Sequence, residues 1–167
     1  TLDMVTYDLC LTNITNGGII KTQSVSVTPL TTGKTWTGTV QYNALTGAQT
    51  IMSGTYTTLT LSNTSGTDTA SGAITINTAL TTTSGGTLDM STYQLLGAFT
   101  PTNGGTLKTS NTTNPAIPTG QTWTGTVQFA ALAGAQYIPA GTYTTLTFSN
   151  TSLTNTAAGA VTATTLT

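Results

Sequence analysis

Charged and catalytic side chains are almost missing from this sequence. Its 167 residues include three lysines, four aspartates and no histidine, arginine or glutamate. Nucleophilic systems of the Ser/His/Asp or Cys/His type need a histidine, and general acid–base catalysis needs titratable groups held close together. We therefore expect no enzyme activity and no cofactor. Isolated aspartates do not make a calcium loop, and the absence of a basic patch argues against nucleic-acid binding.

Cysteine and long apolar runs are equally scarce. Cys10 is the only cysteine, which excludes a disulfide within the chain, and Leu96 takes its place in a second copy of the pattern described below. We therefore expect Cys10 in a buried apolar position. No run of 18 apolar residues suggests membrane insertion. The first four residues do not form a basic and apolar leader, and the low charge with abundant Thr, Ser, Gly and Asn is typical of a secreted, extracellular or cell-surface protein.

An internal repeat organises what is present. Residues 33–65 and 120–152 align without a gap at an offset of 120 − 33 = 87, and eight of the 33 positions differ, so that 33 − 8 = 25 are identical. We divide the chain into a first repeat, residues 1–86, and a second repeat, residues 87–167. Repetition of this kind predicts units that stack and complete each other's hydrophobic core.

β-Structure is expected throughout both repeats. The chain has 48 threonines, which are β-branched and favour strands. In residues 35–42 polar side chains alternate with Trp36, Val40 and Tyr42, which share one face. Apolar residues do not recur at helical spacing. Because the segments with alternating polar and apolar side chains end at Gly, Asn, Asp or Ser, we predict short strands joined by tight turns.

Two all-β architectures fit this pattern. A right-handed β-solenoid would wind each repeat into about four or five coils around a narrow apolar ladder. The alternative is two tandem β-sandwich domains, since 80 to 100 residues is roughly the length of an immunoglobulin-like domain. Large core residues are few, and no linker separates the copies near residues 81–86. These two observations favour the solenoid.

Three segments also resemble a known kind of protein. They read GTVQYNALTGAQTIMSGTYTTLTLSNTSGT, GTVQFAALAGAQYIPAGTYTTLTFSNTS and SGAITINTALTTTSGGTLDMSTYQL. They are similar to the Thr-rich repeat segments of large secreted surface proteins and adhesins of Bacteroidetes-type bacteria. The resemblance implies right-handed β-solenoid repeats with no active site. Cys10 and the proline-bearing insert at residues 114–118 depart from the pattern.

Repeated aromatic and threonine residues are the candidates for ligand binding. Four aromatics recur in both copies: Trp36, Trp123, Tyr56 and Tyr143. Exposed, they would form a ladder for the sugar rings of surface glycans, whereas buried they would thicken the core, which we favour for the tryptophans. Thr-X-Thr triplets place two hydroxyls about 7 Å apart on one strand face, as in ice-binding solenoids, which they resemble. Their irregular spacing favours a merely solvent-facing strand surface.

Two charged positions recur as well. Asp3 matches Asp89, and Lys21 matches Lys108. We expect an aspartate that caps a turn and a solvated lysine. The alternative is a Lys–Asn isopeptide crosslink assisted by the aspartate, which needs all three groups buried together.

The segments at the two ends of the chain match segments on either side of the boundary between the repeats. The run from Leu2 to Met4 matches that from Leu88 to Met90, and residues 160–166 match residues 73–80. Few charges protect the strand edges from pairing with another chain. We therefore predict a structural protein, a subunit or repeat segment of a surface filament or adhesin, whose partners are copies of itself. The expected contact residues are Thr1, Leu2, Met4, Leu9, Leu11, Val161 and Leu166.

Overall fold

The computed structural model describes residues 1–150 and 154–167, and these residues fold into strands, loops and turns. No helix occurs among these residues. The strands are β1 (Leu2–Asp3), β2 (Ile19–Thr22), β3 (Lys34–Tyr42), β4 (Thr50–Ile51), β5 (Gly54–Leu61), β6 (Thr67–Ala70), β7 (Ile74–Thr82), β8 (Thr87–Asp89), β9 (Leu95–Leu96), β10 (Thr100–Asn103), β11 (Thr106–Thr109), β12 (Gln121–Phe129), β13 (Tyr137–Ile138), β14 (Gly141–Phe148), β15 (Thr156–Ala157) and β16 (Val161–Leu166).

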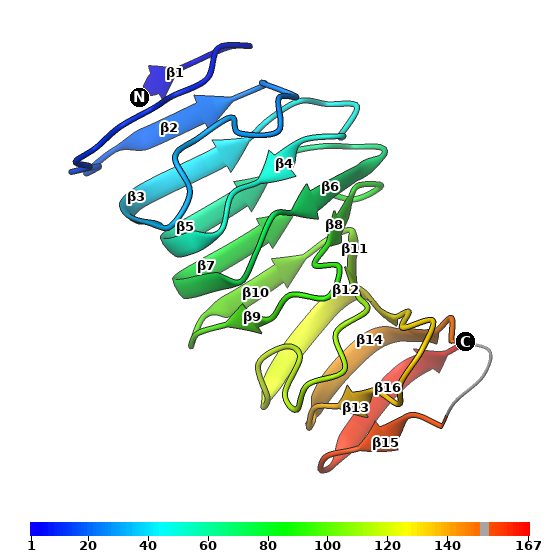
Figure 1. Cartoon of the computed structure of the whole chain (residues 1–167). Helices are drawn as coiled ribbons and strands as arrows, with labels where there is room; N and C mark the ends of the chain where they lie inside the picture. The colour runs from blue at the N-terminus through cyan, green and yellow to red at the C-terminus, as the bar shows by residue number, and fades with distance from the viewer. Residues whose placement is uncertain (151–153) are drawn as a thin grey trace.

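Successive coils stack in parallel register. Val40 lies opposite Leu59, Leu59 opposite Leu80, and Leu80 opposite Pro101, so the coils are 59 − 40 = 19, 80 − 59 = 21 and 101 − 80 = 21 residues long. The result is a β-solenoid of about eight turns, seen as a staircase of strands with the chain ends at opposite ends of the stack (Figure 1). This confirms the predicted solenoid. The β-sandwich alternative is wrong, because every strand pairing among the described residues is parallel.

Each coil has three strand-bearing sides. One coil runs through β4, the first part of β5, the second part of β5 and then β6, which returns to pair with β4. The pairing of β5 with β3 is interrupted by a bulge between Trp36 and Thr39, and the pairing of β14 with β12 by one between Trp123 and Thr126. A bulge bends the strand locally and increases its twist, so that one strand passes from one side of the coil to the next.

The core fills the inside of this stack. The alternation predicted for residues 35–42 holds, since Trp36, Val40 and Tyr42 are fully buried. The same inward positions are occupied in the second repeat by Trp123, Val127 and Phe129. Strand stacking places similar side chains above one another. The rings of Trp36 and Tyr56 are stacked, with their centroids 6.5 Å apart.

The two repeats have equal internal pairing. Trp36 pairs with Tyr56 and Val40 with Leu59 in the first repeat, and the equivalent residues pair in the same way in the second, with the bulge at the same place. The aligned windows thus adopt the same strand pairing in both copies as far as residue 150, and Thr151 and Ser152 lie outside the described residues.

The second repeat is rotated around the axis relative to the first. Dividing 87 residues by coils of about 20 gives 87/20 ≈ 4.35, or four coils and about one third. The equivalent strands β3 and β12 accordingly lie in different sheets. One seven-stranded sheet runs in the order β1-β2-β3-β5-β7-β10, with β9 also paired to β7. A second runs β16-β14-β12-β11-β8-β6-β4, and β13 and β15 form a separate two-stranded sheet. Both seven-stranded sheets contain strands of both repeats, so the stack is continuous across residues 86 and 87.

Candidate functional site

The four aromatic candidates for ligand binding all lie inside the core. Trp36, Trp123, Tyr56 and Tyr143 are each 0% exposed. The hydroxyl of Tyr56 donates to Met52 O at 2.6 Å, and that of Tyr143 donates to Pro139 O at 2.8 Å. Burial raises the pKa of both tyrosines well above its ordinary value.

The prediction that these aromatics face a ligand is therefore wrong, whereas the predicted burial of the tryptophan pair is confirmed. The reason is positional: all four residues lie at inward-pointing places of strands that have a neighbour on both edges. No sugar-stacking ladder can be built from these four side chains.

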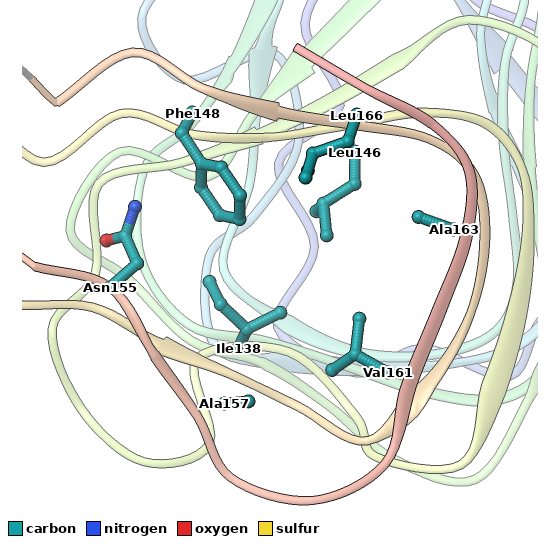
Figure 2. Close-up of a pocket in the computed structure, with 8 residues that line it drawn as sticks. All are labelled: Ile138, Leu146, Phe148, Asn155, Ala157, Val161, Ala163 and Leu166. Carbon is teal, nitrogen blue, oxygen red and sulfur yellow. The ribbon is translucent and has the colours of Figure 1, made fainter.

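The C-terminal end of the stack is a hollow lined by apolar side chains. It has a volume of about 570 Å³. Figure 2 shows Leu146, Phe148 and Ile138 turned toward the same space as Val161 and Leu166 of the last strand. The remaining lining residues are Asn155, Ala157 and Ala163. Among residues 1–150 and 154–167, β16 pairs with β14 alone.

The N-terminal end is a second hollow. Thr1, Leu2, Leu9 and Leu11 line it together with Ile14. Met4, on the same end coil, packs against the core. The structure thus gathers the seven predicted assembly residues at two opposite end surfaces, five at one end and two at the other.

Cys10 also lies on the N-terminal coil, but it is exposed. Leu9 packs against the core and forms a parallel bridge with Leu30, so the next side chain in the alternation points outward. The prediction of a buried apolar position for Cys10 is therefore wrong. Its counterpart Leu96 is only partly buried as well.

The recurring aspartates cap turns, as predicted. Asp3 Oδ1 accepts from Val5 N at 3.0 Å, and Asp89 Oδ1 accepts from Ser91 N at 2.7 Å. Lys108 Nζ lies 2.9 Å from Asp89 Oδ2, with the two side chains on neighbouring coils. In the described part of the chain neither member of this pair hydrogen-bonds an asparagine, so the arrangement is that of a partly exposed ion pair.

A third aspartate, Asp8, has two hydroxyl partners. Its Oδ1 accepts hydrogen bonds from the hydroxyls of Ser24 and Ser26, the latter at 2.8 Å. These bonds, that of Ser24 first, hold the pKa of the Asp8 carboxyl below its usual value. The group lies at the surface of the N-terminal part of the solenoid.

Threonines line up along one side of the stack. Six of them occupy consecutive coils in register on outward-pointing positions: Thr67, Thr87, Thr106, Thr126, Thr145 and Thr165. Neighbouring strands are about 4.8 Å apart, so this rank repeats a hydroxyl at that interval. The irregular spacing of the triplets along the sequence conceals the rank, because coil length varies while the strand register does not.

Two buried glutamines were not predicted. Gln49 Oε1 accepts from Ala44 N at 2.8 Å, and its Nε2 donates to Thr22 O and Ser24 O at 2.9 and 3.0 Å. Gln136 makes the same three contacts one repeat later. Each glutamine joins a loop to the coil before it. The identical Gly-Ala-Gln triplet in the two copies was the available sequence signal.

No group of three or more Cys or Asp side chains is placed to hold a metal ion, within residues 1–150 and 154–167. The same residues contain no helix that could cross a membrane. Comparison with protein families, with curated proteins and with solved structures finds no match to this chain.

Proposed function

We propose that this chain is a non-enzymatic structural protein, a subunit or repeat segment of an extracellular filament or adhesin that assembles head to tail through its end coils. The observation that supports the proposal is the difference in burial between equivalent residues inside the stack and at its ends. Leu2 is 48% exposed, whereas its equivalent Leu88 is 0% exposed. Leu166 is 65% exposed, whereas its equivalent Leu80 is 1% exposed.

These residues differ in burial because the internal ones have a coil on each side. A further coil at either end would remove the exposed apolar surface from water, which stabilises a contact by about 25 cal/mol per Å². It would also satisfy the unpaired backbone groups of the end strands. A heterologous contact of this kind propagates as an open filament when it does not close into a ring.

The low charge of the chain supports the same mechanism. Three lysines and four aspartates provide little repulsion between stacked copies. Contacts made of backbone hydrogen bonds and apolar side chains are insensitive to ionic strength, unlike contacts between exposed charges. Assembly should therefore persist in concentrated salt.

Sedimentation and negative-stain microscopy of the purified protein test the proposal. We expect concentration-dependent filaments that resist salt. Leu166→Asp should reduce assembly because it places a charge in the apolar end surface. Thr124→Asp, on an exposed position of β12 away from both ends, is the matched control and should assemble like the parent protein. A stable monomer at high concentration would contradict the proposal.

The rank of six threonines supports a second candidate, an ice-binding surface. Its hydroxyls form a regular array on one side of a rigid stack, at positions set by strand pairing. Thermal hysteresis of the dilute protein tests it, and Thr126→Tyr near the middle of the rank should abolish any hysteresis. Thr124→Tyr, whose side chain is exposed but outside the rank, is the control. Hysteresis that is absent, or unchanged by Thr126→Tyr, would exclude this candidate.

A further inference from the structure

The molecule contains its own example of a coil docking on an end. The second repeat begins by stacking three short segments on the last strands of the first repeat. On one side, β8 pairs with β6, with Leu88 opposite Asp68. On the next side, β9 pairs with the first part of β7, with Leu95 opposite Ile74 and Leu96 opposite Thr75.

The third segment completes the coil. Strand β10 pairs with the second part of β7, with Pro101 opposite Leu80. All three sides of the coil thus carry a defined parallel register where one repeat meets the next. At this junction Leu88, Leu95 and Leu80 are buried to within 1% of their surface.

Each of these residues has an equivalent at an end of the molecule. The first coil of the second repeat, which stacks on the first repeat, corresponds to the N-terminal coil of the molecule. Its residues and their equivalents are Leu88 and Leu2, Leu95 and Leu9, Leu96 and Cys10, and Pro101 and Ile14. The last strands of the first repeat, on which that coil stacks, correspond to the C-terminal coil of the molecule. Their residues and the equivalents are Asp68 and Asn155, Ile74 and Val161, Thr75 and Thr162, and Leu80 and Leu166. The first set lies on the N-terminal hollow or its edge, and the second set lies on the C-terminal hollow or on its strand.

We propose that a second molecule of this chain docks its N-terminal coil on the C-terminal coil of the first in the register of the internal junction. Leu9 then lies opposite Val161, Cys10 opposite Thr162, and Ile14 opposite Leu166. This inference rests on the proposed head-to-tail assembly and specifies its geometry. One molecule comprises two repeats, so successive molecules are related by two thirds of a turn and by a rise of about 40 Å, from roughly 8.7 coils at 4.8 Å each.

The chemistry of the two ends fits this docking. Leu2, Leu9 and Ile14 would cover the hollow lined by Val161 and Leu166, and both hollows are lined largely by apolar or uncharged side chains. One corner differs in length, because four residues separate Leu9 from Ile14 and five separate Leu95 from Pro101. The register is therefore defined by the paired segments on either side of this corner, Leu9–Cys10 and Ile14, and not by the corner itself.

The exposed thiol of Cys10 provides a direct test of the register. Directly opposed residues of neighbouring strands lie within the Cα separation of 4.4 to 6.8 Å that a disulfide requires, taken as roughly 5 Å here. Thr162→Cys would place a second thiol opposite Cys10 of the next molecule. Diamide takes up two electrons and two protons as the two thiols form the disulfide. We expect a ladder of species at multiples of 17.0 kDa on a non-reducing gel.

Thr142→Cys is the matched control. Thr142 is exposed like Thr162 and lies directly opposite it on the adjacent coil, one step further from the end. We expect no ladder from this variant and none from the parent protein. A disulfide-linked peptide pair that joins Cys10 to the cysteine introduced at position 162, found by mass spectrometry, would establish the link. Circular dichroism of both variants checks that they are folded.

The outcomes separate the register from the assembly itself. Filaments of both variants without a disulfide between Cys10 and position 162 would overturn the register and leave head-to-tail assembly standing. Equal ladders from the two variants would also overturn it. Dimers of the parent protein linked through Cys10 alone would indicate head-to-head contact and overturn the inference. Monomers in every case would overturn both proposals.

Discussion

Replacing Asp68 by asparagine should stabilise the protein at neutral pH. Asp68 is fully buried on β6, where its Oδ1 accepts a hydrogen bond from Gln49 N at 3.0 Å. Its Oδ2 is buried without a hydrogen-bond partner among the described residues. Burial raises the pKa of this carboxyl from 3.8 to about 6, although the Gln49 N–H acts in the opposite direction. The second repeat has Asn155 at the equivalent position, so an amide is already compatible with the fold.

The gain in stability expected for Asp68→Asn follows from the difference between the pKa of Asp68 in the folded and in the unfolded protein. A rise of roughly two units between the unfolded and folded states corresponds to about 3 kcal/mol at 1.36 kcal/mol per unit. Because the folded-state pKa is the higher one, the folded protein binds the proton more tightly. The contribution of Asp68 to the free energy of unfolding is greatest below about pH 4, falls as the pH rises from 4 to 6, and stays constant above that range. The sequence has no histidine, so no histidine titration contributes to the change of stability between pH 4 and 6.

Urea unfolding at pH 4, 5, 6 and 7.5 measures this effect. We expect Asp68→Asn to exceed the parent protein by up to about 3 kcal/mol at pH 7.5 and to equal it near pH 4. Asp89→Asn is the control, because it removes a partly exposed ion pair worth less than about 1 kcal/mol and should lower the stability slightly. Equal pH profiles of the parent protein and Asp68→Asn would refute the assignment of the buried charge.

Three further substitutions test the packing by the same unfolding assay. Gln49→Ala should cost about 3 kcal/mol, because it leaves buried backbone groups of two coils without partners; a loss below about 1 kcal/mol would contradict this role. Gly97→Ala should destabilise the junction, since Gly97 has φ of +109° and an added Cβ would lie 1.9 Å from Ile76 O, whereas Gly17→Ala meets nothing within 4 Å and should be neutral. Trp123→Ala should cost about 3 to 5 kcal/mol and leave the circular dichroism β-rich; retained stability would argue against its place in the core.

Local pattern was enough to predict which side chains point inward. Period-two alternation has a direct geometric cause, because successive side chains of a strand point to opposite faces. It correctly placed Trp36, Val40 and Tyr42 on one face, and the 87-residue repeat of the sequence reappears as equal strand pairing in the two copies. The expectation of about four or five coils in each repeat agrees with coils of 19 to 21 residues in an 87-residue repeat.

Burial of a given inward or outward position depended on its neighbours in the stack. Leu2 and Leu88 have the same local sequence, but only Leu88 has a coil on each side. Cys10 is exposed because its strand segment is terminal and its side chain follows the inward Leu9. Aromatic residues recur in a sequence whether they face a ligand or the core, and only the inward position of Trp123, fully buried and paired with Tyr143 of the next coil, decided between the two.

Strand content, the inward faces and the repeat could be predicted from the amino-acid pattern, because these depend on side-chain size, β-branching and spacing along a single strand. The tertiary structure decided which coil follows which, the rotation of about a third of a turn between repeats, and the rank of six threonines. Those features depend on coil lengths of 19 to 21 residues, which no single strand reveals. Register between coils is set by the summed length of strands, bulges and loops, so a local pattern leaves it undetermined until the coils are stacked.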